Sequence, residues 1–159
     1  MMLTQEQYEY LDNALRINPT VKPRQSAYPF DDGHKPIHTQ CQVTAMHLER
    51  TRGWAAQIGV QWLDKGGFLL PWPHVINWVY SDLFDFSLSI NEHKIGFTLM
   101  GNDVEMANAI TASSGHGYGL TQDGQWMDPL LDKLHKRWFG KLKRFSLIED
   151  QQFNPHFSI

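Results

Sequence analysis

We expect the fold to be organised around residues 113–129, which read Ser113-Ser114-Gly115-His116-Gly117-Tyr118-Gly119-Leu120-Thr121-Gln122-Asp123-Gly124-Gln125-Trp126-Met127-Asp128-Pro129. This stretch holds four glycines, one histidine and two carboxylates. Its Asp-Gly pair between two runs is typical of a tight turn joining two strands. A strand, turn and strand would hold the histidine and the carboxylates in a fixed relation, so we expect a functional site here.

Composition bounds the class of protein. The chain has 159 residues, 42% of them hydrophobic and 13% aromatic, which predicts one globular domain over residues 1–159. A formal net charge of -3 and a charged fraction of 19% do not favour nucleic acid as a partner. The N-terminus lacks the pattern of a signal peptide, and no apolar run is long enough for a membrane span. We expect a protein that is cytoplasmic as synthesised, and action at a cell wall would need another export route.

Before the central stretch, periodicity predicts mainly helices. Thr4 and Gln7 form a capping-box pattern at the start of a helix over 4–17. A proline-containing loop then leads to a helix over 42–52, with Thr39 as a candidate cap and Gly53 as its end. Further helices are expected over the following segments: 54–64 and 74–84, the latter opened by Pro71-Trp72-Pro73.

Strands are expected later in the chain. Residues 84–90 alternate apolar and polar, a turn follows at 91–93, and 94–100 is apolar enough to be the partner strand. Asp103 is expected to cap a short helix over 104–110. A basic amphipathic segment over 130–142 and a strand-like run over 143–148 complete the chain before its C-terminal residues. This order predicts an α+β domain, with N-terminal helices packed on a small antiparallel sheet.

The only cysteine, Cys41, would lie in the first turn of the helix expected after the proline-containing loop. A helix N-terminus stabilises a thiolate, which is the nucleophilic form of cysteine. A histidine can take the thiol proton, and a carboxylate can hold the imidazole. His116 and Asp128 have the order in the chain that this chemistry needs. The alternative is that Cys41 is a buried apolar side chain without chemistry.

The segment Gln40-Cys41-Gln42-Val43-Thr44-Ala45-Met46 resembles the nucleophile segment of papain-like cysteine peptidases of the bacteriocin-leader-processing type and their phage and bacterial relatives. The pairs Gly115-His116 and Asp128-Pro129 resemble the histidine strand and following Asp-Pro of that family. The resemblance implies a papain-like fold, with Cys41 as nucleophile, His116 as general base and Asp128 as its orienting partner. Gln25 and Gln40 are candidates for the glutamine that stabilises the oxyanion. No cofactor is implied.

A second reading of the same stretch gives a metal site. The pattern Ser114-x-His116-x-x-Gly119-x-Thr121-x-Asp123 resembles the signature of zinc-dependent D-alanyl-D-alanine carboxypeptidases and L-alanyl-D-glutamate endolysins. The segment Pro155-His156-Phe157 resembles the last motif of that family. The resemblance implies zinc as cofactor, bound by His116, Asp123 and His156 with an open position for hydrolysis.

Both resemblances imply a hydrolase that cuts peptides, commonly those of bacterial peptidoglycan. We therefore expect a thiol peptidase or amidase first, a zinc-dependent cell-wall peptidase second, and a non-enzymatic inhibitor or immunity protein, which binds a protein partner, third. Six further histidines show no ligand spacing and are mostly expected at the surface or at caps: His34, His38, His47, His74, His93 and His135. The basic run 133–144 is expected to be a solvated helix face rather than a site for a phosphate-bearing polymer.

Overall fold

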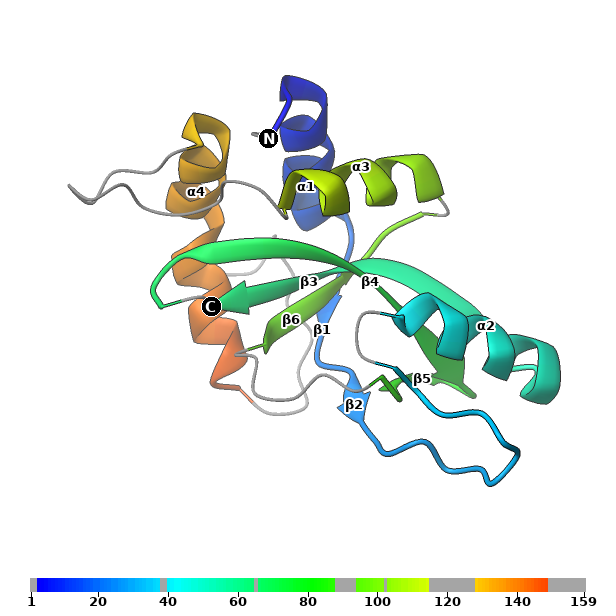
Figure 1. Cartoon of the computed structure of the whole chain (residues 1–159). Helices are drawn as coiled ribbons and strands as arrows, with labels where there is room; N and C mark the ends of the chain where they lie inside the picture. The colour runs from blue at the N-terminus through cyan, green and yellow to red at the C-terminus, as the bar shows by residue number, and fades with distance from the viewer. Residues whose placement is uncertain are drawn as a thin grey trace.

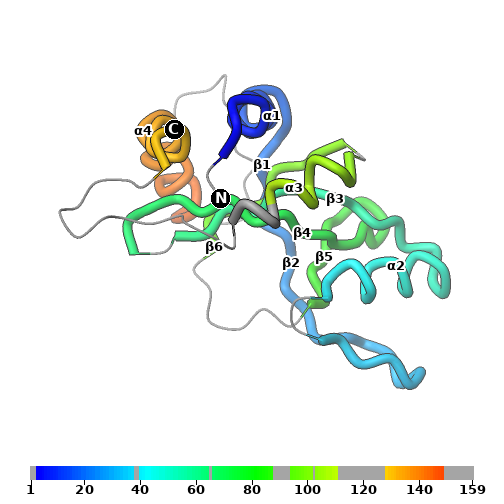
Figure 2. Tube along the Cα trace, turned by 45° about the horizontal axis from the view of Figure 1, so that its top comes forward, coloured from blue at the N-terminus to red at the C-terminus, as the bar shows by residue number. Residues whose placement is uncertain are grey.

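In the computed structural model, four helices surround one curled six-stranded sheet, which makes the chain a single α+β domain (Figures 1 and 2). The structure describes residues 3–37, 40–64, 66–87, 94–101, 103–114 and 128–148. In chain order the elements are α1 (Gln5–Ile17), β1 (Thr20–Val21), β2 (Arg24–Gln25), α2 (Cys41–Arg52), β3 (Ala56–Asp64), β4 (Leu69–Val79), β5 (Asp82–Asp85), β6 (Lys94–Leu99), α3 (Val104–Ser114) and α4 (Pro129–Ser146). None of the described helices has the length and apolar character that crossing a membrane requires.

The strand order in the sheet is β1-β6-β3-β4-β5-β2. All neighbouring strands are antiparallel except β2 and β5, which are parallel, so the sheet is mixed rather than purely antiparallel as predicted. The two outermost strands, β1 and β2, are consecutive in the chain and separated only by Lys22 and Pro23. Because such a short step joins the two edges, the sheet must curl until its edges approach each other (Figure 1).

The main core lies between the sheet and three of the helices. Leu11 and Leu15 of α1 and Leu134 and Trp138 of α4 pack with Trp62 of β3, and all five are almost fully buried. The remaining helix, α2, packs on β4, where the Asn77 amide donates hydrogen bonds to the carbonyl oxygens of Ala45 and Trp54. A second cluster, around Ile76, Leu83 and Phe97, fills the other side of the sheet. Phe97 lies so close to Gly59 that a Cβ there would be 2.1 Å from the ring.

Local signals placed most of the helices correctly. The capping box of Thr4 and Gln7 is present in α1, and Gly53 ends α2 in the left-handed conformation. Gln40 occupies the N-cap of α2 without a side-chain hydrogen bond, in place of the expected Thr39. The Asp103 carboxylate caps α3, which extends to Ser114.

Several predicted elements are wrong. Residues 54–64 and 74–84 were expected to be helices but form β3, most of β4 and β5. Residues 94–99 form a strand, as expected, but β6 pairs with β1 and β3 instead of making a hairpin with the preceding strand. The run 143–148 continues α4 as far as Ser146. The expected hairpin over 113–129 begins inside α3 and ends inside α4, and its central residues 115–127 lie outside the described part of the chain.

Candidate active site

The N-terminus of α2 places Cys41 beside a buried histidine and aspartate. Cys41 is the first residue of the helix, and its side chain is half-buried. His74 lies in the middle of β4, and Asp85 ends β5, the next strand of the sheet. The short β4–β5 connection at Tyr80 and Ser81 brings the strands together, since Val79 pairs with Asp82. The result is a cysteine from α2, a histidine from β4 and an aspartate from β5 in one place.

His74 and Asp85 form a buried ion pair. The Nε2 atom of His74 lies 2.8 Å from Oδ2 of Asp85, and the two side chains are only 6% and 3% exposed. Burial alone would lower the pKa of His74, but hydrogen bonds and charge from Asp85 and Cys41 raise it to about 9. Burial alone would raise the pKa of Asp85, but His74 and Ser87 lower it to about 2. The pair is therefore an imidazolium beside a carboxylate at neutral pH.

The Cys41 thiol is shifted towards its nucleophilic form. Burial alone would raise its pKa, and the charge of Asp85 acts in the same direction. The hydrogen bond and positive charge of His74, with a hydrogen bond from the backbone of Val75, outweigh these effects and lower the pKa of Cys41. The resting thiol also lies 3.7 Å from Oε1 of Gln42. The arrangement supports a thiolate–imidazolium pair, which is the reactive state of a thiol nucleophile with its base.

Ser87 completes the surroundings of the Asp85 carboxylate. Its N–H donates to Oδ1 of Asp85 at 2.9 Å, and its hydroxyl donates to the same oxygen. The Ser87 hydroxyl also lies 3.3 Å from Nε2 of His74. Because Oδ2 of Asp85 contacts His74 and Oδ1 accepts from Ser87, the Asp85 carboxylate has one fixed orientation. That orientation determines which ring nitrogen of His74 faces it.

The structure places the predicted site residues as follows. Cys41 lies at a helix start beside a histidine, as its proposed chemistry requires, but the histidine is His74 and its carboxylate partner is Asp85. Asp128 is buried at the N-cap of α4, where Oδ1 accepts from the N–H groups of Leu130 and Leu131 and Oδ2 from that of Leu3. These contacts give Asp128 a structural role.

Three further predicted site residues lie outside the described part of the chain: His116, Asp123 and His156. The zinc site therefore stays a prediction. Among the described residues, no group of three or more His, Cys, Asp or Glu side chains could hold a metal ion.

Sequence reasoning missed His74 because it expected a helix there. A strand places every second side chain on the same face of the sheet. In β4, one such face carries Trp72, His74, Ile76 and Trp78. The β4–β5 register pairs Asn77 with Phe84, so the next pair places Asp85 opposite Ile76, as a diagonal neighbour of His74 on the same face of the hairpin. Read as two strands with a turn at Tyr80 and Ser81, the sequence would have placed both side chains together.

The two glutamines considered for the oxyanion have different surroundings. The Nε2 atom of Gln25 donates to the carbonyl oxygens of Asp85 and Ser87, so its amide is already used in the structure. Gln40 is exposed and directly precedes Cys41. Backbone N–H groups in the first turn of a helix also have no acceptor within the helix. Gln40 and the first turn of α2 are therefore the better candidates for stabilising an oxyanion.

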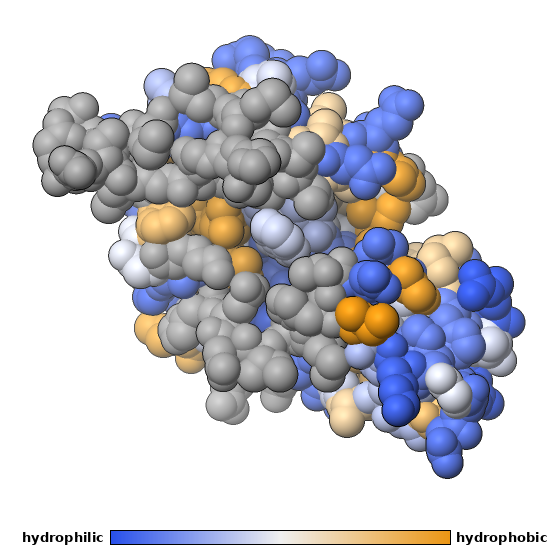
Figure 3. All heavy atoms as spheres, viewed as in Figure 1, coloured by the Kyte–Doolittle hydropathy of each residue, from blue (hydrophilic) through white to orange (hydrophobic). Residues whose placement is uncertain are grey.

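Apolar side chains are exposed beside the nucleophile. Ile37, Val43 and Met46 are 57%, 46% and 42% exposed, and all lie within five residues of Cys41 in the sequence. Apolar atoms are visible on the face of the molecule where α2 lies (Figure 3). The start of α2 thus offers apolar contacts as well as a thiol.

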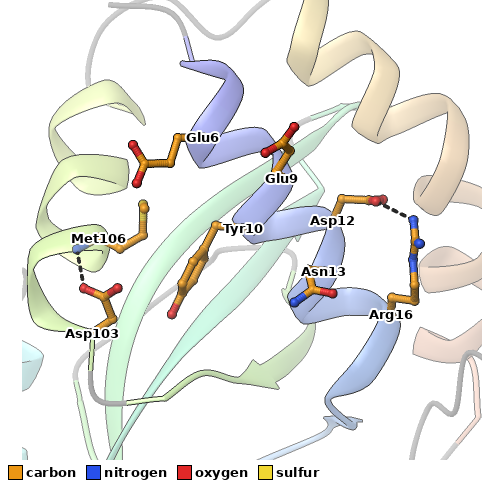
Figure 4. Close-up of a pocket in the computed structure, with 8 residues that line it drawn as sticks. All are labelled: Glu6, Glu9, Tyr10, Asp12, Asn13, Arg16, Asp103 and Met106. Carbon is orange, nitrogen blue, oxygen red and sulfur yellow. Dashed lines mark hydrogen bonds and ion pairs between the residues drawn. The ribbon is translucent and has the colours of Figure 1, made fainter.

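A hollow between α1 and α3 has a different character (Figure 4). It is lined mainly by polar and acidic side chains: Glu6, Glu9, Tyr10, Asp12, Asn13, Arg16, Asp103 and Met106. Asp12 is already paired with Arg16 at 2.7 Å and accepts a hydrogen bond from the indole of Trp138 at 2.8 Å. Burial, followed by the charge of Asp103, raises the pKa of Tyr10. The hollow lacks a nucleophile with an adjacent base.

Comparisons of this chain with protein-family models, with curated proteins and with solved structures found no match.

Proposed function

We propose that the protein is a thiol hydrolase that cleaves a peptide or amide bond, with Cys41 as nucleophile, His74 as general acid and base, and Asp85 as the group that orients His74. The observation that supports this proposal is the contact of a thiol at a helix N-terminus with a buried His–Asp pair. A papain-like arrangement is part of the proposal, with His74 and Asp85 taking the roles that the sequence assigned to His116 and Asp128.

The first half of the reaction transfers an acyl group to the enzyme. The Sγ thiolate of Cys41 attacks the carbonyl carbon of the substrate, and the electron pair of the C=O bond moves to oxygen. The oxyanion collapses, the C–N bond breaks, and His74 gives its proton to the leaving nitrogen. Nε2 of His74 is held by Asp85, so we assign this transfer to Nδ1. The products are a thioester on Cys41 and a free amine.

Water then releases the acyl group. Neutral His74 takes a proton from a water molecule, whose oxygen attacks the thioester carbon. The C–S bond breaks, the carboxylic acid leaves, and the thiolate of Cys41 is restored beside the imidazolium. Asp85 keeps the ring in one orientation throughout, as the carboxylate of a catalytic triad does.

The decisive experiment measures the rate of Cys41 alkylation by iodoacetamide against pH in the wild type, His74→Ala and His116→Ala. We expect the wild-type thiol to react well below the pH at which an ordinary cysteine ionises, about 8.5. His74→Ala should lose this reactivity, and His116→Ala should keep it. The opposite result would return the base role to His116.

An ordinary thiol in the wild type would refute the thiol mechanism. Metal analysis of the protein and chelator sensitivity of peptidoglycan cleavage would then test the zinc alternative on His116, Asp123 and His156. Absence of both chemistries would leave the protein-binding alternative. Peptidoglycan peptides, which are common substrates of both families that the sequence resembles, are the first peptides to assay with the wild type and Cys41→Ala.

A further inference from the structure

Lys94 reaches the candidate site from a distant strand. It begins β6, which β3 and β4 separate from β5 in the sheet. Its Nζ atom nevertheless lies 3.7 Å from Oδ2 of Asp85, the oxygen that also contacts His74. The same ammonium donates to Oε1 of Gln25 at 2.7 Å. The curl of the sheet thus brings a cation onto the buried carboxylate of the site.

Gln25 holds the backbone that carries this carboxylate. Gln25 lies in β2, opposite Asp85 in β5. Its Nε2 atom donates to the carbonyl oxygens of Asp85 at 3.2 Å and Ser87 at 3.1 Å. The N–H of Ser26 donates to the Asp85 carbonyl as well, at 3.0 Å. The turn from Asp85 to Ser87 is therefore fixed to β2 at both ends.

We propose that Gln25 and Lys94 are positioning residues for the reaction, Gln25 holding the backbone of Asp85 and Lys94 holding its carboxylate against His74. This inference rests on the proposed function and assigns to these two residues a role in keeping the general base oriented.

The charge of Lys94 has a specific use in such a reaction. When His74 gives its proton to the leaving group, the buried carboxylate of Asp85 loses the imidazolium beside it. A buried carboxylate without a cation is strongly disfavoured and tends to protonate or move. Lys94 retains its charge during this step, so Asp85 stays ionised and in place to receive the imidazolium again. An uncharged side chain at position 94 would not provide the positive charge that keeps Asp85 ionised.

The test compares Lys94→Met with Arg24→Met. Arg24 neighbours Gln25 in β2 and also makes an ion pair at 3.7 Å, but with Asp82 instead of Asp85, so it is a matched control. The readouts are kcat and KM for N-acetyl-L-alanine p-nitroanilide, an amide whose leaving nitrogen takes a proton, the rate of Cys41 alkylation, and thermal unfolding. We expect Lys94→Met to lower kcat by about tenfold, as loss of an outer partner of a catalytic group commonly does, with KM within about twofold of the wild type.

Two more variants separate positioning from folding. Lys94→Arg keeps the cation and should restore kcat to within about threefold of the wild type. Gln25→Glu keeps an oxygen for Lys94 but loses both hydrogen bonds to the carbonyl groups, and should lower kcat severalfold. Arg24→Met should match the wild type. Lys94→Arg and Gln25→Glu keep the test informative if Lys94→Met fails to fold.

Each remaining result decides against one of the two proposals. Equal kcat values in Lys94→Met, Gln25→Glu and Arg24→Met, in a wild type with a reactive thiol, would overturn the positioning role alone. A loss of kcat that Lys94→Arg does not restore, with an equal loss of thermal stability, would also overturn it. A wild type without acylation and with an ordinary thiol would refute the proposed function itself.

Discussion

Two His–Asp pairs lie against the same helix, and their geometry is almost the same. At the start of α2, Nε2 of His74 is 2.8 Å from Oδ2 of Asp85. On the side of α2, Nε2 of His47 is 3.0 Å from Oδ2 of Asp32, in the loop that precedes the helix. The ring of His34 stacks on His47, with centroids 4.5 Å apart. Distance alone would give the two pairs the same role.

Their surroundings differ. The side chains of His47 and Asp32 are 21% and 22% exposed, whereas those of His74 and Asp85 are 6% and 3% exposed. Asp32 also accepts from Tyr28, and these hydrogen bonds, with that of His47 the largest, lower its pKa. The Asp32 pair has no thiol among the partners that the structure gives it. A His–Asp pair thus anchors a loop when it is solvated, and can serve as a base when it is buried beside a nucleophile.

The largest expected effect concerns the Sγ atom of Cys41, which lies beside the His74–Asp85 pair and has no counterpart beside the His47–Asp32 pair among the partners that the structure gives it. Cys41→Ala removes the proposed nucleophile, so hydrolysis should fall by about a thousandfold or more. The half-buried position of Cys41 in the first turn tolerates alanine, so thermal unfolding should change little. Activity assays and circular dichroism on the same sample check both expectations. Substantial remaining activity would place the chemistry elsewhere.

Replacing each histidine tests the comparison directly. His74→Ala should lower activity by about a hundredfold or more, because it removes both proton transfer and the charge that stabilises the thiolate. His47→Ala should leave kcat within about twofold and lower stability by about 1 kcal/mol at most, as for other partly exposed pairs. Steady-state kinetics and urea unfolding measure the two effects. Similar losses of activity in both variants would mean that burial does not distinguish the pairs.

The pH dependence of stability should also differ between the His74–Asp85 pair and the His47–Asp32 pair. The pKa of His74 is raised from 6.5 to about 9, so its contribution to stability is complete below pH 6.5 and is lost as the pH rises through about 9. The pKa of Asp85 is lowered from 3.8 to about 2, so its contribution is complete above pH 3.8 and is lost as the pH falls through about 2. Asp85→Asn should flatten the alkaline part of this profile.

Asp32→Asn is the control for this measurement. The lowered pKa of Asp32 gives a contribution that is present at neutral pH and is lost in acid, so this variant should change only the acid part of the profile. Thermal unfolding midpoints across pH 6.5 to 9 compare the two variants. An alkaline slope unchanged in Asp85→Asn would show that Asp85 does not raise the pKa of His74.

The smallest expected effect concerns Ser87. Ser87→Ala removes the hydroxyl from Oδ1 of Asp85 but keeps the backbone N–H on the same oxygen. One hydrogen bond to a charged group is worth about 1.5 to 3 kcal/mol, and the retained N–H should limit the loss of kcat to about tenfold. Ser87→Thr, which keeps the hydroxyl, should recover most of it. A loss as large as that of His74→Ala would give Ser87 a direct role in proton transfer.

The sequence predicts those parts of the fold that depend on local signals. The capping box of Thr4, the glycine that ends α2 and the carboxylate cap of α3 each act within a few residues. The position of Cys41 at a helix start follows from the same kind of signal. The nucleophile could therefore be proposed from the sequence.

The base, His74, could not be proposed from the sequence, because its position depends on the pairing of β4 with other strands. Pro71 and Pro73 favoured the start of a helix, yet both lie in the part of β4 that pairs only with β3 among the described strands, where a missing N–H is tolerated. In β3, Ile58, Val60 and Trp62 alternate with polar residues or glycine, which is the period of a strand and not of the helix predicted over 54–64. Without β3 and β4, nothing in the sequence brings His74 to Cys41.

The short segment that joins the outer strands also bears on self-association. Exposed strand edges are templates on which another chain can add, and long flat ones promote aggregation. In this protein β3 lies between β4 and β6, β5 covers only the end of β4 among the described strands, and both outermost positions in the strand order are held by two-residue strands from residues 20–25. Displacing this one segment would uncover β6 and β5 together. Resistance to aggregation and the hydrogen bonds that hold Asp85 therefore depend on the same few residues.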